Sequence, residues 1–298
     1  MAIFAIACNH SSISEPSTSA NCRRVDHVAG KACVPFAPER LVTLGIPTMA
    51  DALALGVKPI GTILYFDELP PYLKGKLDGI EPVGTANQPS LEKILTLNPD
   101  LIIAMNDSDL SYQQMSKIAP TVVDDWIGYP HWKKHFNFVA EVLGKNQEAK
   151  QVWANYEERI QKLRVALPEN YQDIEVSFVR ICCGKLATDV KNSFSGMILE
   201  DVGLSRPPAQ NVEDDDGLVF LSEELITNMD GDIIFLVVDR EDDDAKRIFE
   251  QLQQKPLWNQ LKAVREGRVY PVNLPTWRGG NPLAADAVID DLFKYLVE

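Results

Sequence analysis

The feature that most constrains the fold is a fourteen-residue pattern that occurs twice. SLEKILTLNPDLII, at residues 90–103, is followed 132 residues later by SEELITNMDGDIIF, at residues 222–235. Each stretch reads as the acidic first turn of a helix, a break, and an aspartate that opens an apolar strand. Three polar positions recur in register, namely Ser90, Glu92 and Asp100 in the first stretch and Ser222, Glu224 and Asp232 in the second. Two copies in separate halves of a chain predict two similar lobes with the same helix-to-strand corner.

Short apolar runs alternate with helical stretches in both halves, which is typical of an α/β fold with a mainly parallel sheet. In the first half we expect strands at 41–45, 58–63, 100–105 and 120–124, and helices at 48–56, 90–97 and 111–118. In the second half we expect strands at 174–183, 232–239 and 268–273, and helices at 193–203, 245–254 and 282–297.

The longest helical pattern lies between the two halves. From Ala149 to Leu167, apolar side chains recur at gaps of three and four, which defines one stripe of a helix about six turns long. A helix of this length can cross from one lobe to the other, and a cleft between lobes is the default place for a ligand. We therefore predict an N-terminal lobe over 25–142, a linking helix over 143–168 and a C-terminal lobe over 169–298.

The net charge of the chain and its lack of enzyme motifs limit the classes of function that it can have. The net charge of −14 and the pI near 4.8 argue against nucleic acid and anionic membrane surfaces as partners, because the long-range field repels both. The chain contains no G-x-G-x-x-G after its first strand, no P-loop and no G-x-S-x-G. We therefore expect a binding protein and not an enzyme.

The N-terminal segment indicates export. MAIFAIAC resembles the end of a bacterial lipoprotein signal, with Cys8 as the lipidated residue, and the Ser-rich stretch that follows would complete a flexible tether over 1–24. A plain disordered N-terminus is the alternative. Cys22 and Cys33 bracket ten residues, a suitable loop for a disulfide in an exported protein, with two free thiols as the alternative. The adjacent pair at 182–183 reads as packed thiols.

Several segments together resemble the iron-siderophore-binding proteins of bacterial ABC importers. They include VDHVAGKACVPFAPERLVTLGIPTMADALALGVKPIG, SLEKILTLNPDLIIA, MSKIAPTVV and PLWNQLKAVREGRVYPVNLPTWRGGNPLAADAVIDDLFKYL. The resemblance covers residues 25–298. It implies two Rossmann-like α/β lobes joined by one long helix, a monomer in the periplasm, and a ferric siderophore as ligand with no cofactor. It also implies that Glu92 and Glu224, one on each lobe, dock on arginines of the permease.

The resemblance and the strand ends together suggest ligand contacts. Arg180 ends a strand and is expected to contact the siderophore, with an internal salt bridge as the alternative. Trp277 is expected to form a wall and Arg278 a second cation, in a loop that could instead be a structural anchor. The rim residues expected on the N-terminal lobe are Tyr65, Asn106, Trp126 and Tyr129.

The loop after the strand at 100–105, MNDSD, lacks the basic residue that the family often has there. This favours a hydroxamate or hydroxamate-citrate siderophore over a catecholate. Haem or cobalamin is an alternative cargo, and a chelatase-like metalloenzyme is a more distant alternative. His131 and His135 have helical spacing, but their lysine neighbours favour a solvated face over a metal site, so we expect iron to be held only through the siderophore.

Overall fold

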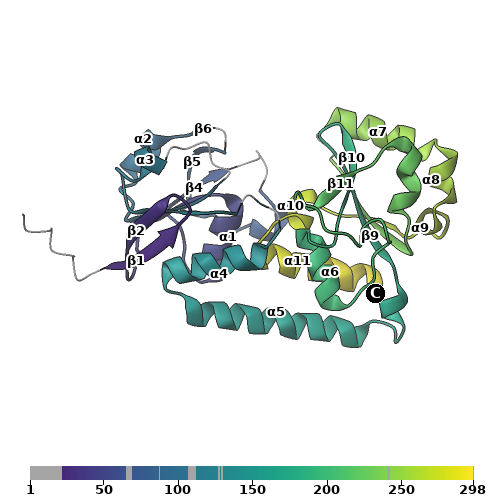
Figure 1. Cartoon of the computed structure of the whole chain (residues 1–298), viewed down its shortest axis with the longest axis horizontal. Helices are drawn as coiled ribbons and strands as arrows, with labels where there is room; N and C mark the ends of the chain where they lie inside the picture. The colour runs from purple at the N-terminus through teal and green to yellow at the C-terminus, as the bar shows by residue number, and fades with distance from the viewer. Residues whose placement is uncertain are drawn as a thin grey trace, which may run out of the picture.

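The computed structural model shows two α/β lobes side by side above one long helix (Figure 1). The structure describes residues 22–64, 69–86, 88–106, 112–126, 128, 130–239 and 242–297. The predicted fold class, two lobes linked by a helix, is confirmed. No helix in this described part of the chain is long and apolar enough to cross a membrane.

The N-terminal lobe is built on a six-stranded sheet of order β6-β5-β4-β3-β7-β8, parallel except for β6. Its strands are β3 (Leu41–Leu44), β4 (Gly61–Leu64), β5 (Glu81–Thr85), β6 (Gln88–Pro89), β7 (Leu101–Met105) and β8 (Thr121–Asp124). Its helices are α1 (Ile46–Ala54), η1 (Pro71–Leu73), α2 (Leu91–Thr96), α3 (Tyr112–Met115) and α4 (Trp132–Leu143). Apolar clusters cover both faces of this sheet, as a parallel sheet requires.

A two-stranded hairpin, β1 (Cys22–His27) and β2 (Gly30–Pro35), precedes this sheet. The expected disulfide between Cys22 and Cys33 is present and joins the two strands, with their Cα atoms 5.5 Å apart. The expectation of packed thiols at 182–183 is confirmed for Cys182, which is a buried free thiol, and is wrong for Cys183, which is a free thiol but exposed. Cys8, the residue expected to carry a lipid, lies outside the described residues.

The C-terminal lobe has a five-stranded sheet of order β11-β10-β9-β12-β13, with β9, β12 and β13 parallel. Its strands are β9 (Val176–Cys182), β10 (Lys185–Asp189), β11 (Leu218–Phe220), β12 (Ile233–Val238) and β13 (Val269–Pro271). Its helices are η2 (Tyr171–Asp173), α6 (Phe194–Val202), η3 (Glu223–Met229), α7 (Asp243–Gln253), α8 (Pro256–Gln260), α9 (Lys262–Arg265), α10 (Leu274–Trp277) and α11 (Pro282–Leu296).

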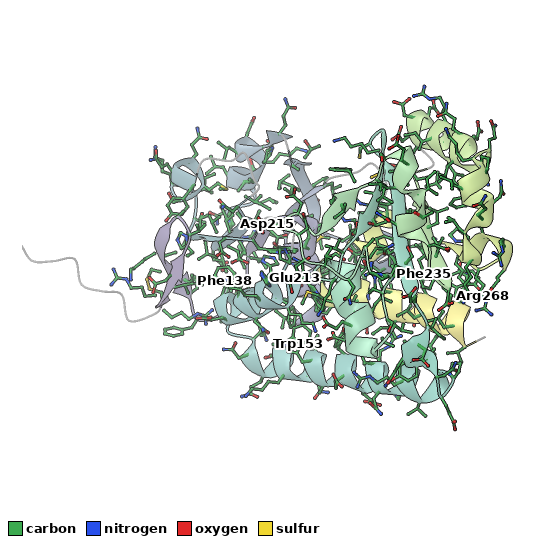
Figure 2. The ribbon with its side chains drawn as sticks, turned by 45° about the vertical axis from the view of Figure 1, so that its right-hand side comes forward. Phe138, Trp153, Glu213, Asp215, Phe235 and Arg268 are labelled. Atoms are coloured by element: carbon green, nitrogen blue, oxygen red, sulfur yellow. A yellow bond between two sulfur atoms is a disulfide. The ribbon has the colours of Figure 1, made fainter. Side chains whose placement is uncertain are left out.

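The linking helix α5 (Asn146–Ala166) runs beneath both lobes (Figure 1). Its buried stripe, Ala149, Tyr156, Ile160 and Leu163, follows the predicted periodicity. One apolar cluster joins the stripe to both lobes, because it contains Trp132 of α4 and Phe194 of α6. Trp153 of α5, labelled in Figure 2, adds its ring 5.5 Å from that of Trp132. The two lobes therefore share a core, and the proposed lobe boundaries remain predictions.

The repeated pattern forms two corners that share one hydrogen-bonding device. The Asp100 carboxylate accepts from the backbone N–H groups of Glu39, at 2.8 Å, and Arg40, at 3.0 Å, just before β3. The Asp232 carboxylate accepts from the backbone N–H of Glu175 at 2.8 Å, just before β9. Each aspartate precedes a strand that pairs in parallel with the strand whose start it holds. The repeat therefore fixes the registration of two central strand pairs.

The two corners differ at their helices. Ser90 caps α2, since its hydroxyl accepts from the backbone N–H of Lys93 at 3.3 Å. Ser222 makes no side-chain capping bond, and the segment after it is the 3-10 helix η3, which is kinked at Leu225. Ser90 therefore caps its helix, and the matching Ser222 does not.

We predict that the corner aspartates are structural. Asp100→Ala leaves two backbone N–H groups without their acceptor and should lower the free energy of unfolding by about 1–3 kcal/mol. Urea unfolding followed by circular dichroism measures this change. Asp26→Ala, which breaks only an exposed ion pair with Lys31, should leave the midpoint unchanged. Equal midpoints for Asp100→Ala and Asp26→Ala would disprove the structural role.

Asp232 makes the free energy of unfolding depend on pH, and this dependence can be measured. Burial alone would raise its pKa, but the bonds from the Lys262 ammonium and the Glu175 N–H lower the pKa overall. A lowered carboxyl pKa adds stability above the ordinary value of 3.8, and that stability is lost as the pH falls through the lowered value. The stability difference between wild type and Asp232→Asn should therefore be present at pH 7 and shrink below about pH 4 in urea unfolding series.

Candidate ligand-binding site

Arg180 lies near the end of β9 and is 7% exposed. Its Nε donates to Oδ1 of Asp189 on the adjacent strand β10 at 3.0 Å. Its Nη1 donates to Sγ of Cys182 at 3.3 Å. The internal salt bridge, one of the two alternatives that the sequence left open for Arg180, is therefore present.

Asp189 is shared among three arginines. Nε of Arg278, just after α10, lies 3.2 Å from Oδ2 of Asp189. Arg206 donates from Nη2 to the backbone carbonyl of Asp189, and to Oε1 of Gln210 at 2.7 Å. Three guanidiniums therefore contact this one aspartate. The sequence predicted two cations here, and the structure brings both together on one carboxylate.

Burial shapes the electrostatics of this cluster. It raises the pKa of the Asp189 carboxyl, against the opposing charges of Arg278, Arg180 and Arg206. It also lowers the pKa of Arg206 to about 10, so this guanidinium keeps its charge at neutral pH. Both pKa shifts arise because the charged groups have been removed from water. In the protein interior, the attraction of a guanidinium for an incoming anion is stronger than at an exposed site. The cluster is therefore suited to bind an anion.

Trp277 does not form a wall of this site. It is fully buried, with its ring centroid 5.0 Å from that of Phe178 and 4.5 Å from that of Phe235. Its indole N–H donates to the Asp291 carboxylate at 2.8 Å. The expectation of a ligand wall is corrected by this burial. Trp277 anchors α10 against the sheet, and that anchor places the next residue, Arg278, beside Asp189.

Of the four residues expected on the rim of the N-terminal lobe, the structure describes Asn106 and Trp126, and only Asn106 is exposed. Asn106 is exposed after β7, as expected, and its backbone N–H donates to the Trp126 carbonyl at 3.3 Å. The Trp126 side chain is 6% exposed, stacks on His135 with centroids 4.5 Å apart and donates to the Pro130 carbonyl at 2.6 Å. Tyr65 and Tyr129 lie outside the described residues.

The expectation that His131 and His135 lie on a solvated face is wrong for His135. It is fully buried on α4, a helix that the sequence did not predict. Its Nδ1 lies 2.5 Å from Asp124 Oδ2, and its Nε2 lies 3.1 Å from Thr48 Oγ1 and 3.5 Å from Asp51 Oδ2. Burial, reinforced by Asp124, raises the pKa of Asp51 well above its usual range. In the described part of the chain, no group of three or more His, Cys, Asp or Glu residues is arranged to hold a metal ion.

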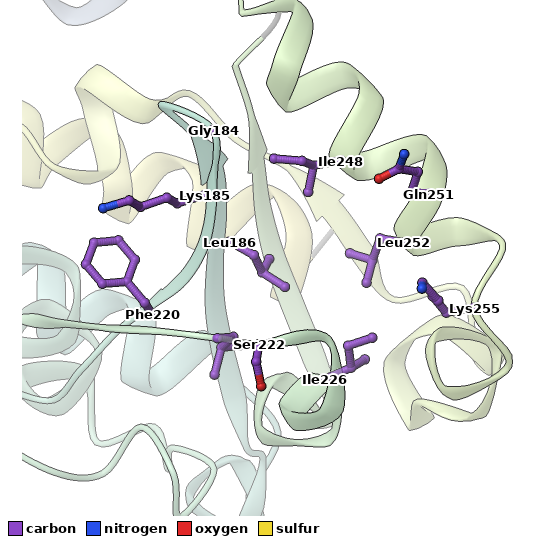
Figure 3. A pocket seen from close by; sticks show the side chains of 11 residues that line it. Gly184, Lys185, Leu186, Phe220, Ser222, Ile226, Ile248, Gln251, Leu252 and Lys255 are labelled. Atoms are coloured by element: carbon purple, nitrogen blue, oxygen red, sulfur yellow. The ribbon is translucent and has the colours of Figure 1, made fainter.

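A cavity of about 500 Å³ opens in the C-terminal lobe between β10, η3 and α7 (Figure 3). Leu186, Ile226, Ile248 and Leu252 form its apolar lining, and Ser222 of the second corner lies at its edge (Figure 3). None of Arg180, Trp277 and Arg278 lines it. This cavity is therefore separate from the arginine cluster.

The two glutamates expected to dock on a permease are both exposed. Glu92 lies in the first turn of α2 and Glu224 near the start of η3. Neither side chain has a bond that the fold depends on among the described contacts, so both carboxylates are accessible to a partner.

Two residues of the cluster, Asp189 and Arg206, were missed by sequence reasoning. The only local signal for Asp189 is a carboxylate that ends a short strand, KLATD. Arg206 stands in a proline-rich loop with no periodic pattern. Their importance comes from contacts across the fold, which a local pattern does not reveal.

Comparison with known proteins identifies the family. The model of a family described as periplasmic binding protein matches residues 50–273, well over half of the chain. A probable siderophore-binding lipoprotein of Bacillus subtilis is 32% identical, with 100% of this chain and 96% of the relative covered. The achromobactin-binding periplasmic protein of Dickeya dadantii is also 32% identical, with 87% of each covered.

A solved structure supports the same family assignment. Staphylococcus aureus SirA, complexed with staphyloferrin B, matches with a TM-score of 0.81 and 29% identity, covering 92% of this chain and 98% of SirA. These relatives are substrate-binding proteins and not enzymes, which confirms the interpretation drawn from the missing enzyme motifs. The chain therefore belongs to the periplasmic binding protein family, in company with the siderophore-binding members that its sequence resembles.

Proposed function

We propose that the protein is the substrate-binding component of an ABC importer that captures a ferric siderophore and delivers it to the permease. The observation that carries this proposal is the cluster of three arginines at Asp189, where Arg180 and Arg278 contact the carboxylate and Arg206 donates to the backbone carbonyl. Guanidinium groups donate charge-assisted hydrogen bonds to the oxygens of an anionic ligand. The named ligands of the relatives, achromobactin and staphyloferrin B, support a siderophore.

The cluster favours a hydroxamate-citrate complex. A guanidinium presents paired N–H groups that match the two oxygens of a carboxylate or a hydroxamate. On the N-terminal lobe, the exposed residue after β7 is the neutral Asn106, so that side adds no cation after β7. A complex of moderate negative charge suits this arrangement better than a highly charged catecholate complex.

Delivery of the siderophore to the permease would use the glutamates at the two corners. Glu92 and Glu224 are exposed at equivalent positions of the two lobes, and a carboxylate on each lobe can pair with an arginine on each permease subunit. A lipid on Cys8 would hold the protein at the membrane on the periplasmic side, as a monomer. The sequence pattern supports the lipid and the family supports the compartment.

The first test of the ligand site is mutation of its cations. Arg180→Gln and Arg278→Gln should each weaken binding of a ferric hydroxamate-citrate complex by about 1.5–3 kcal/mol, because each removes hydrogen bonds from a charged donor. Quenching of tryptophan fluorescence during titration of the purified variants gives the Kd.

A matched control is Arg159→Gln on α5, whose guanidinium pairs with Asp286 and Asp290 of α11. It should bind the complex as wild type does. Thermal unfolding of each variant separates lost binding from lost folding. Wild-type affinity in folded Arg180→Gln and Arg278→Gln, across a panel of ferric siderophores, would rule out the proposed site.

The docking role has a separate test. The double variant Glu92→Ala with Glu224→Ala should bind the ferric complex with wild-type affinity, because neither residue belongs to the arginine cluster. It should nevertheless abolish uptake of labelled iron by cells that express the cognate permease, since both ion pairs to the permease are lost.

The control is Glu157→Ala with Glu169→Ala, which also removes two exposed carboxylates. Glu157 lies on α5, on the opposite side of the molecule from α2 (Figure 1). This variant should support normal uptake. Uptake at the wild-type rate by the Glu92 and Glu224 double variant would refute docking through the corners.

A further inference from the structure

We propose that Cys182 and Cys183 are a redox pair at the edge of the ligand site: a small-molecule disulfide oxidises them to one reversible disulfide, and this bond weakens ligand binding. The effect on binding rests on the proposed function, whereas formation of the bond can be tested without it. Both thiols are free in the structure. The chain already holds the disulfide between Cys22 and Cys33, as expected for a protein that matures in an oxidising compartment.

The backbone places the two thiols differently from two neighbours within a strand. Cys182 ends β9 and pairs with Lys185 of β10, so Cys183 and Gly184 form a two-residue turn. Both turn residues have a positive φ, 56° for Cys183 and 69° for Gly184. Cys183 therefore leaves the alternation that would point adjacent side chains to opposite faces. Its thiol hydrogen-bonds with that of Cys182, so the two sulfurs lie within reach of each other.

The shape of this turn does not explain a cysteine at position 183. Two-residue hairpin turns with a positive φ at both positions favour Asn, Asp or Gly, and other residues are uncommon there. The turn is also fixed to its neighbours, because the Gly184 N–H donates at 3.4 Å to the carboxylate of Asp242, which caps α7. A reactive thiol is therefore held at a defined place beside a second one.

The two thiols differ in access, and this difference sets the order in which they react. Cys183 is exposed, whereas Cys182 is 5% exposed. Burial raises the pKa of the Cys182 thiol, against the charge of Arg180, which lowers it. A buried, protonated thiol reacts slowly with molecules from solution. Cys183 is therefore the thiol that an external disulfide meets first.

Oxidation takes two exchange steps. The Cys183 thiolate attacks one sulfur of the small-molecule disulfide, which forms a mixed disulfide and releases one small thiol. Cys182 then loses its proton and attacks the sulfur of Cys183, which releases the second small thiol and closes the Cys182–Cys183 bond. The protein loses two electrons and two protons, and the small-molecule disulfide gains them. Because Cys182 is the chain neighbour, the second step has the advantage of an intramolecular reaction.

The bond would be reversible and would disturb the ligand site. Consecutive Cα atoms are about 3.8 Å apart, less than the roughly 4.4–6.8 Å of ordinary disulfides, so the bond is strained and easily reduced. Closing it moves Sγ of Cys182 toward Cys183. That sulfur accepts from Nη1 of Arg180 at 3.3 Å. Since Arg180 is an expected ligand contact, oxidation changes the surroundings of a group that binds the ligand.

The first test is peptide mapping by mass spectrometry of the full-length protein, incubated with oxidised glutathione and then alkylated. In wild type, the peptide that holds residues 182–183 should lose two hydrogens and take up no alkylating reagent. In Cys182→Ser, Cys183 should keep the glutathione, because no second thiol releases it. In Cys183→Ser, the buried Cys182 should take up no glutathione. Wild type that keeps glutathione on Cys183, or that leaves both thiols free, would overturn the proposal.

The second test is the affinity for a ferric hydroxamate-citrate complex, measured by tryptophan fluorescence. The Kd of oxidised wild type should be about fivefold higher than that of reduced wild type, because a hydrogen bond of Arg180 is disturbed. Cys183→Ser treated with oxidised glutathione should keep the Kd of its untreated form. Equal Kd values for oxidised and reduced wild type would contradict the proposal. If reduced wild type binds no ferric complex, the proposed function fails, and the mapping still tests the redox pair.

Discussion

The apolar core that the two lobes share is the constraint on which the rest of the structure depends. Trp132 of α4 is buried at its centre and packs against Trp153 and Tyr156 of α5 and against Phe194 of α6. The helix α4 belongs to one lobe and α6 to the other, so a wide opening of the lobes would expose several aromatic rings to water. The molecule is therefore built for small relative motions of its lobes, and a ligand has to be bound by side chains that are already in place.

The loop between α10 and α11 connects this core to the arginine cluster. Gly280 has a φ of +64°, and a Cβ added there would lie 2.6 Å from the Trp126 ring, so only glycine allows the backbone to approach the N-terminal lobe this closely. The next residue, Asn281, donates to the hydroxyl of Tyr72 on η1 at 3.1 Å. Arg278 stands two residues before Gly280. The position of one cation of the cluster therefore depends on a contact between the lobes.

The sequence predicted the parts of the fold that rest on local patterns. The stripe of α5, the corner aspartates Asp100 and Asp232, and the pairing of Cys22 with Cys33 can all be read from spacing alone. Helix α4 was missed because its first turn, WKKH, is rich in charge, and only packing shows that His135 turns inward. The cluster could be predicted only in part, because its members come from four segments that the fold brings together.

The composition of that cluster is hard to explain by stability alone. A buried ion pair contributes little net stability, because the cost of removing both charges from water offsets their attraction, and apolar side chains of similar volume often serve as well. A third guanidinium, Arg206, raises that cost further, as the lowering of its pKa to about 10 shows. Guanidiniums kept at the end of a central strand in spite of this cost are most simply explained by a ligand whose anionic oxygens they bind. The Asp189 carboxylate, which contacts both Arg180 and Arg278, offsets part of the cost of burying these charges.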